Sequence, residues 1–167
     1  MSDHPTQGKL LFIGGAAGVG KTSVVSRVTE LVASRSHANC VVRNTGTYFK
    51  NALESIGQPV AGRDEIRHAR WKAVESTVAA QIVSEFHIFE EGSENLLFIV
   101  DTHFAVSSPL GYMIGLGIKY IEAASASIFD SEITQKMEQY LAAVVLVETD
   151  LLSILQRRQV DLDRIRV

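Results

Sequence analysis

Eight consecutive residues decide the fold: Gly15-Ala16-Ala17-Gly18-Val19-Gly20-Lys21-Thr22. They match the pattern Gly-x-x-x-x-Gly-Lys-Ser/Thr, a loop that joins a strand to a helix and wraps around phosphates. Glycines let backbone N–H groups approach a phosphate closely, and the start of the helix adds the positive end of its dipole. We expect Lys21 to project toward solvent and phosphate, and Thr22 to ligate Mg²⁺. With Ser23, the stretch predicts a site for a nucleoside triphosphate and its magnesium ion.

The sequence around this loop has the order of strand, loop and helix that the motif requires. An apolar run at residues 10–13 stops at Gly14, as a buried parallel strand would, and residues 23–34 have a helical pattern. Further apolar runs follow at residues 40–43, 96–100 and 143–147. Strands that alternate with helices predict an α/β fold, a three-layer α/β/α sandwich with a parallel sheet, of the P-loop NTPase class. We expect a single domain over residues 1–167.

The spacing of apolar residues also predicts what lies between the strands. Helices are predicted at residues 48–56, 66–86 and 118–141, and from about residue 150 onward. A glycine-punctuated loop is predicted after Asp101. Because the carboxyl ends of parallel strands share one edge of a sheet, where ligands bind, three segments are expected to meet there. They are Gly14-Gly15, Thr45-Gly46 and Asp101-Thr102-His103.

Asp101 is the candidate partner of Thr22 in holding Mg²⁺, through a water molecule. It follows an apolar strand that is expected beside the first strand, which would bring its carboxylate near the phosphate loop. An aspartate that caps a helix is the alternative for this position.

Composition limits the partners of the chain. The formal net charge is -3, with 16 Lys and Arg against 19 Asp and Glu, so no nucleic-acid partner is expected. The first eight residues are polar, and no apolar run approaches the ~20 residues that span a bilayer. A soluble, cytoplasmic protein without a membrane partner is therefore predicted.

The motifs, in their order and spacing, resemble those of the archaeal-type adenylate kinases, which belong to the nucleoside-monophosphate kinase group of P-loop enzymes. The resemblance runs from residue 9 to residue 166. Besides the phosphate loop, it rests on Thr45-Gly46-Thr47, Arg63-Asp64 with Arg67, Asp101-Thr102-His103 followed by Pro109, Gly111-Tyr112 and Gly115-Leu116, Val147-Glu148-Thr149, and Arg157, Arg158, Asp161, Arg164 and Arg166. An Asn-Lys-x-Asp string, expected in guanine-specific switch proteins, does not occur.

The resemblance implies reversible transfer of a phosphoryl group between ATP and AMP, with Mg²⁺. It implies an acceptor-binding region at about residues 45–90 and a partial lid at about residues 156–167. The implied acceptor-binding residues are Thr45, Gly46, Arg63, Arg67 and His103, and the implied catalytic residues are Lys21, Arg157, Arg158, Arg164 and Arg166. Relatives of this type are often trimers, so a homo-oligomer is expected.

The arginines and the histidine also have structural interpretations. The arginines at residues 157, 158, 164 and 166 could form a solvated basic helix end. Arg63 and Arg67 could be surface charges at the start of a helix. His103 could bind a phosphate or a buried loop backbone. Two other functions stay open as well. One is a regulatory protein that binds or slowly hydrolyses ATP, and the other is a kinase of a hydroxyl acceptor, with Asp101 as its base.

The sequence departs from the family in three places. Ser107 and Ser108 stand where a lysine usually occurs, the prolines usual after Gly-Tyr and Gly-Leu are absent, and residues 123–140 are longer than expected. The family also continues with a further helix, a fifth strand and another helix, whereas the sequence printed here ends at Val167. We therefore expect the strand at residues 143–147 to lie at an uncovered sheet edge, and the chain as printed to bind ATP weakly and transfer phosphate poorly.

Overall fold

A computed structural model describes residues 8–36, 38–66, 68–69, 71–91, 95–103, 105–108, 111–114 and 140–160. Its elements, in chain order, are β1 (Lys9–Gly14), α1 (Lys21–Arg35), β2 (Asn39–Asn44), α2 (Thr45–Ser55), α3 (Arg63–Ile66), the 3₁₀ helix η1 (Trp71–Val74), α4 (Glu75–Glu91), β3 (Leu96–Thr102), β4 (Ala105–Ser108), β5 (Gly111–Ile114), β6 (Leu141–Leu146) and α7 (Leu151–Val160).

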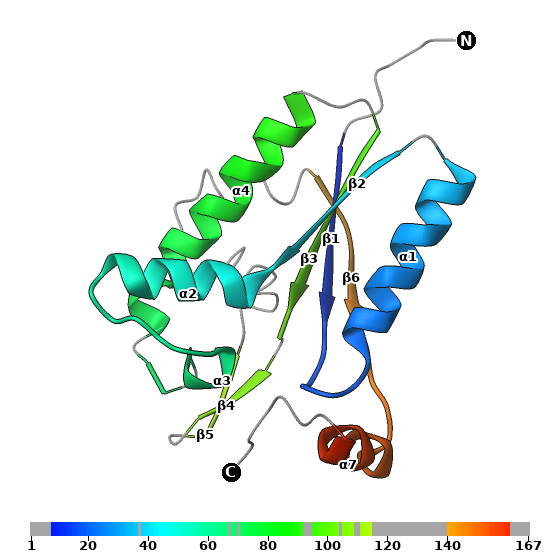
Figure 1. Cartoon of the computed structure of the whole chain (residues 1–167). Helices are drawn as coiled ribbons and strands as arrows, with labels where there is room; N and C mark the ends of the chain where they lie inside the picture. Colours follow the sequence, from blue (N-terminus) through cyan, green and yellow to red (C-terminus); the bar gives the residue numbers. More distant parts are fainter. Residues whose placement is uncertain are drawn as a thin grey trace, which may run out of the picture.

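Four strands form a parallel sheet in the order β2-β3-β1-β6. Helix α1 covers one face of the sheet, and α2 and α4 cover the other (Figure 1). The predicted parallel sheet and its three-layer α/β/α arrangement are therefore confirmed. From β1 the chain crosses first to β2 on one side and later to β6 on the other side. The loop after β1 thus lies at the kind of crossover point where open α/β sheets bind ligands.

The two central strands alternate between two apolar layers. Phe12 of β1 and Phe98 of β3 pack into the cluster that contains residues of α2 and α4, and both side chains are almost fully buried. Ile13 and Ile99, the next residues along each strand, pack with Val25 of α1 on the other face. Both faces are covered, which explains why each strand is a continuous apolar run in the sequence rather than an alternating one.

The prediction of one long helix at residues 66–86 is wrong for residues 66–74. The chain forms the single turn α3, then a turn at residues 68–69, then η1, and only then the long helix α4. Ile66 and Ala69 nevertheless pack against the same core cluster as Val78 and Ile82 of α4. Apolar periodicity reports which side of the chain is buried, and that side stays the same through the turns.

The loop predicted after Asp101 contains a hairpin. Strands β4 and β5 pair antiparallel, with Ser108 opposite Gly111. Strands of four residues are too short to show a hydrophobic period, so only the turn residues are visible in the sequence. The helix predicted at residues 118–141 lies almost wholly outside the described residues, and Leu141 begins β6 instead.

Strand β6 lies at an edge of the sheet, as expected for the run at residues 143–147. Its side chains are poorly covered by the described residues: Val145 is 37% exposed and Leu146 is 54% exposed. Among the described helices, none has the length and apolar character needed to cross a membrane.

Candidate active site

The phosphate loop connects β1 to α1 with backbone that requires glycine. Gly18 and Gly20 have φ values of 87° and 101°, in the left-handed region that other residues rarely adopt. Gly15 is required for a different reason: a Cβ atom there would lie 2.4 Å from the carbonyl oxygen of Val147. The N–H group of Val147 donates to Gly14 O at 2.8 Å, so the segment after β6 holds the base of the loop closely.

Lys21 is the first residue of α1, and its ammonium group lies against the loop rather than in solvent. Its Nζ donates to the carbonyl oxygens of Gly15 at 3.0 Å and Ala16 at 3.2 Å, and the residue is only 8% exposed. The prediction that this side chain projects to solvent is therefore wrong. Two backbone carbonyl oxygens of the loop thus accept hydrogen bonds from the amine. The ammonium group is nonetheless bonded to the phosphate loop.

Thr22 and Ser23 follow in the first turn of α1, and both are exposed. Gly20 is the N-cap and has no side chain with which to bind the first N–H groups of the helix. A helix start of this kind presents N–H groups and a positive dipole end to an anion.

Asp101 lies where the sequence analysis expected it, on β3 beside β1, with Ile13 as its β1 partner and Asn44 as its β2 partner. Its Oδ2 accepts a hydrogen bond from Nδ2 of Asn44 at 2.6 Å. Its Oδ1 is buried and has no hydrogen-bond partner among the described residues. An unsatisfied buried carboxylate oxygen calls for an explanation such as a water or an ion. The position does not cap a helix, so that alternative is excluded.

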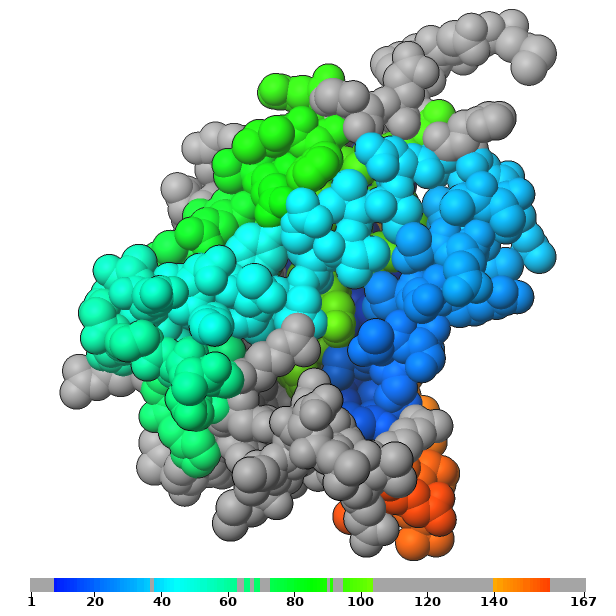
Figure 2. Space-filling model, in the orientation of Figure 1, coloured from blue at the N-terminus to red at the C-terminus, as the bar shows by residue number. Residues whose placement is uncertain are grey.

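The start of α2 lies directly after β2 and contacts β3. Thr45 is 4% exposed, and its hydroxyl donates to the backbone oxygen of Asp101 at 3.3 Å and lies 3.3 Å from Thr102 Oγ1. The N–H of Gly46 donates to Asn44 Oδ1 at 3.0 Å, which caps the helix. In the space-filling view, β2 and the start of α2 reach the surface next to α1 (Figure 2).

His103 follows β3 and lies beside the phosphate loop. Its Nε2 is 3.5 Å from Nζ of Lys21, so the imidazole and the ammonium group face the same space. The three segments expected to meet at the carboxyl edge of the sheet therefore do meet.

The remaining predicted site residues are described only in part or not at all. Arg63 begins α3, and Arg157 and Arg158 belong to α7, but their side chains lie outside the described residues. Arg67, Arg164 and Arg166 lie outside the described residues entirely. Helix α7 follows a strand parallel to β1, so it is at the same end of the sheet as the phosphate loop (Figure 1).

The comparisons with known proteins agree with this geometry. The adenylate kinase of Sulfurisphaera tokodaii is 33% identical over 161 residues, which are 95% of this chain and 72% of that protein. The chain belongs to the adenylate kinase family. The adenylate kinase of Methanoculleus marisnigri is 30% identical over 162 residues, again 95% of this chain and 72% of the relative. The family expected from the motifs is thus confirmed.

Two further comparisons add nothing to this assignment. No protein-family model matches the chain. Among solved structures, the thymidylate kinase of Ehrlichia chaffeensis aligns with a TM-score of 0.42 and 14% identity, over 90% of this chain and 82% of its own.

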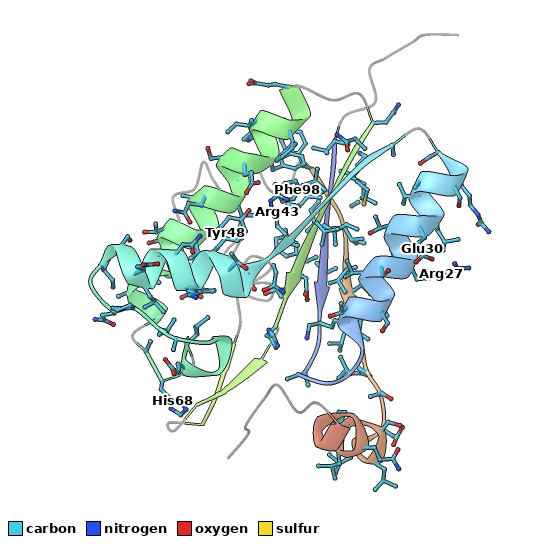
Figure 3. All side chains as sticks on the ribbon, viewed as in Figure 1. Arg27, Glu30, Arg43, Tyr48, His68 and Phe98 are labelled. Atoms are coloured by element: carbon cyan, nitrogen blue, oxygen red, sulfur yellow. The ribbon has the colours of Figure 1, made fainter. Side chains whose placement is uncertain are left out.

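In this member of the adenylate kinase family, a polar cluster that sequence reasoning missed anchors the start of α2. Glu85 of α4 accepts from Arg43 Nε at 2.5 Å and from the Tyr48 hydroxyl, and Arg43 also lies 5.2 Å from the centre of the Phe89 ring. Arg43 and Tyr48 meet between α2 and α4 (Figure 3). The three polar residues come from β2, α2 and α4, and no local pattern in the sequence connects them.

The charge states of this cluster follow from its contacts. Partial burial raises the pKa of the Glu85 carboxyl, but the hydrogen bonds from Arg43 and Tyr48 outweigh it, and the pKa is lowered. The pKa of Arg43 is raised, chiefly by its hydrogen bond to Glu85. Burial and the Glu85 bond raise the pKa of the Tyr48 phenol as well. Near neutral pH, Glu85 is therefore ionised and Arg43 charged.

We expect Glu85→Gln to lower the free energy of unfolding by about 1 kcal/mol near neutral pH, because a charged acceptor with two donors is lost. A lowered carboxyl pKa stabilises the fold above the unfolded pKa, roughly 4.3, and this contribution disappears as the pH falls through the folded value. Urea unfolding of both proteins at pH 7 and pH 3 measures the difference.

The control is Glu30→Gln, which breaks the exposed pair of Arg27 and Glu30 on α1. That change should shift stability by less than about 0.5 kcal/mol, because exposed ion pairs contribute little. A Glu85→Gln variant with the same small effect at pH 7 would show that the cluster does not anchor α2.

Proposed function

We propose that this chain transfers the γ-phosphoryl group of ATP to AMP and so forms two molecules of ADP. The observation that carries the proposal is that Lys21 and His103 lie side by side at the phosphate loop, with Asp101 opposite Ile13 of β1, in a chain of the adenylate kinase family. The family resemblance supports AMP as the acceptor, and the position of Lys21 beside His103 supports the carboxyl edge of the sheet as the place of transfer.

The donor half of the site is the phosphate loop, residues 15–23. Backbone N–H groups of the loop and of the first turn of α1 bind the phosphates of ATP. Lys21, held at the centre of the loop by Gly15 and Ala16, exchanges carbonyl oxygens for phosphate oxygens. The charge that spreads over the transferred group is balanced by groups already in place, which is the main catalytic device in phosphoryl transfer.

The acceptor half requires no general base. A phosphate monoester has its second pKa near about 6, so an oxygen of AMP is already an anion at neutral pH. This oxygen attacks the γ-phosphorus of ATP, and the bond from that phosphorus to the bridging oxygen of the β-phosphate breaks. The leaving group is ADP, and the phosphorylated acceptor is a second ADP. Asp101 is thus free to serve the metal rather than the nucleophile.

Mg²⁺ fits the residues present. Thr22 provides an exposed hydroxyl, and Asp101 provides a buried oxygen without a partner among the described residues. Oxygen donors are what Mg²⁺ prefers, and it commonly keeps its waters between itself and a carboxylate. We propose that Thr22 holds the ion and that Asp101 holds it through water. When bound, Mg²⁺ neutralises phosphate charge and fixes the geometry of the triphosphate.

We further propose the division of the domain implied by the resemblance, with the acceptor at residues 45–90 and a lid at residues 156–167. Thr45 and Gly46 begin the acceptor region beside β3. The lid would bring Arg157, Arg158, Arg164 and Arg166 over the phosphates and exclude water, which otherwise competes as the acceptor. Self-association belongs to the same proposal, and sedimentation measures it.

A panel of acceptors tests the assignment. ATP and Mg²⁺ are offered with AMP, GMP, CMP, UMP or dTMP, and nucleoside diphosphate formation is followed in a coupled assay. We expect AMP to be the preferred acceptor. If another monophosphate is phosphorylated well and AMP is not, that monophosphate is the acceptor and the assignment of AMP is wrong. If ATP is hydrolysed at a rate independent of any acceptor, the chain is a hydrolase and not a kinase.

We expect Arg67→Ala to raise the KM for AMP about 10–100-fold, because a charge-assisted hydrogen bond contributes roughly 1.5–3 kcal/mol. The affinity for ATP should change less than twofold. Steady-state kinetics with AMP varied and direct ATP binding give the two numbers. The matched control is Arg27→Ala, an arginine whose side chain is 69% exposed on α1, for which neither number should move. Equal losses for ATP and AMP in Arg67→Ala would remove Arg67 from the acceptor site.

A further inference from the structure

One side chain connects the two halves of the proposed site. Asn44 is the last residue of β2 and the N-cap of α2. Its amide makes two hydrogen bonds in opposite senses: Nδ2 donates to Asp101 Oδ2 at 2.6 Å, and Oδ1 accepts from the N–H of Gly46 at 3.0 Å. Asp101 is the proposed metal carboxylate, and Gly46 lies in the first turn of the proposed acceptor helix.

The contact with Asn44 determines which oxygen of Asp101 is left for a ligand. Oδ2 is occupied by the amide, whereas Oδ1 is buried without a partner among the described residues. The backbone oxygen of Asp101 also accepts from the hydroxyl of Thr45 at 3.3 Å. The N-cap residue Asn44 therefore contacts the side chain of Asp101, and Thr45, the first residue of α2, contacts its backbone.

We propose that Asn44 is a positioning residue that orients Asp101 toward the metal and couples that orientation to the start of α2. The proposal rests on the proposed function. In this proposal, Asn44 acts through Asp101 on the donor side and through the N-terminus of α2 on the acceptor side. Outer partners of this kind that orient a metal-binding carboxylate commonly contribute about 10–100-fold to metal affinity or activity.

The chemistry of the position explains why an amide is needed. Asp101 offers an acceptor and Gly46 offers a donor, so the connecting side chain must donate at one end and accept at the other. A carboxylate at residue 44 could accept from Gly46 but would face Asp101 as a second negative charge. A serine could cap the helix, but its single short hydroxyl does not also reach Asp101. Asparagine satisfies both partners at once.

Two substitutions separate the two contacts. Asn44→Ser keeps an oxygen for the helix cap and removes the donor to Asp101, while Asn44→Ala removes both. We expect both variants to require about 10–100-fold more Mg²⁺ for half-maximal tightening of ATP binding. ATP binding in EDTA should stay unchanged in both. Asn44→Ser should lower kcat and leave the KM for AMP within about twofold, whereas Asn44→Ala should also raise that KM, because α2 loses its cap.

Two controls keep a structural effect apart from a positioning effect. Ser34→Ala removes a hydroxyl that bonds a backbone oxygen at the far end of α1, and it should leave the Mg²⁺ requirement unchanged. In an Asp101→Ala background, Asn44→Ser should no longer change the Mg²⁺ requirement, because the partner through which it acts is gone. Thermal unfolding of each variant shows whether the fold is retained.

The results distinguish a failure of the proposed role of Asn44 from a failure of the proposed kinase function. Equal Mg²⁺ requirements in the unaltered chain and in Asn44→Ser would show that Asn44 is a helix cap and nothing more, and the proposal would fail alone. ATP binding by the unaltered chain that does not respond to Mg²⁺ would overturn the proposal and the proposed function together. An undiminished effect of Asn44→Ser without Asp101 would show that the residue acts by another route.

Discussion

Lys21→Ala is expected to lower kcat for ADP formation by about 100- to 1,000-fold, the cost of removing one preorganised cation or donor from a charged transition state. The ammonium group lies at the centre of the phosphate loop, bonded to the carbonyl oxygens of Gly15 and Ala16. We expect a phosphate bound in the loop to contact this ammonium group without a change in the backbone of the loop. Stopped-flow and steady-state assays with ATP and AMP measure the loss.

The fold should survive this change. The two carbonyl bonds of Lys21 have a charged donor and contribute about 1.5–3 kcal/mol each, but Ala16 is exposed, so water can replace the donor at one of them. Because the side chain is buried, Lys21→Met is the matched variant, since it nearly keeps the volume and removes the charge together with its N–H donors. Both variants should lose phosphoryl transfer to the same extent. Their melting temperatures should fall by about 2–4 °C for each kcal/mol of unfolding free energy that is lost. Full activity in Lys21→Met would show that the charge takes no part in transfer.

Gly15→Ala is expected to have the second-largest effect, through the backbone. The added Cβ would lie 2.4 Å from Val147 O, closer than the 3.0 Å that real Cβ atoms essentially never cross. Both groups belong to the main chain, so the loop and the segment after β6 must separate. Overpacking of this kind costs about 1–3 kcal/mol of stability, and a loop displaced by about 1 Å can lose roughly 100-fold in transfer.

Gly62→Ala is the control, because a Cβ at Gly62 would have nothing within 4 Å. Its melting temperature and ATP affinity should equal those of the unaltered chain. Calorimetry and ATP titration of the two variants make the comparison. If Gly15→Ala kept both values, the contact between Gly14-Gly15 and Val147 would not set the shape of the loop.

The features predicted from sequence are those with a strong local signal. The phosphate loop, four strands of the sheet and the helices beside them follow from continuous apolar runs, helical spacing and glycine positions. Asp101 could be placed beside β1 because it ends an apolar run, and parallel strands bring such ends together. The family followed from the order of several motifs, each weak alone.

The features that escaped prediction depend on contacts between distant residues. The cluster of Arg43, Tyr48 and Glu85 joins three elements, and its members have no spacing that marks them. The sequence predicts that Lys21 projects to solvent and phosphate, but the side chain is buried, because the motif indicates what the side chain binds and not where it lies without phosphate. The turns between α3 and α4 were missed because their apolar residues face the same core as the helix does.

A label on the γ-phosphate of ATP shows whether the phosphoryl group goes to AMP or to water. The chain is incubated with ATP labelled at the γ-phosphate, Mg²⁺ and AMP, and the products are separated. We expect label in the β-phosphate of ADP, at a rate that depends on AMP and on Mg²⁺ and is lost in Lys21→Met. Label that appears only in inorganic phosphate, at a rate indifferent to AMP, would contradict it.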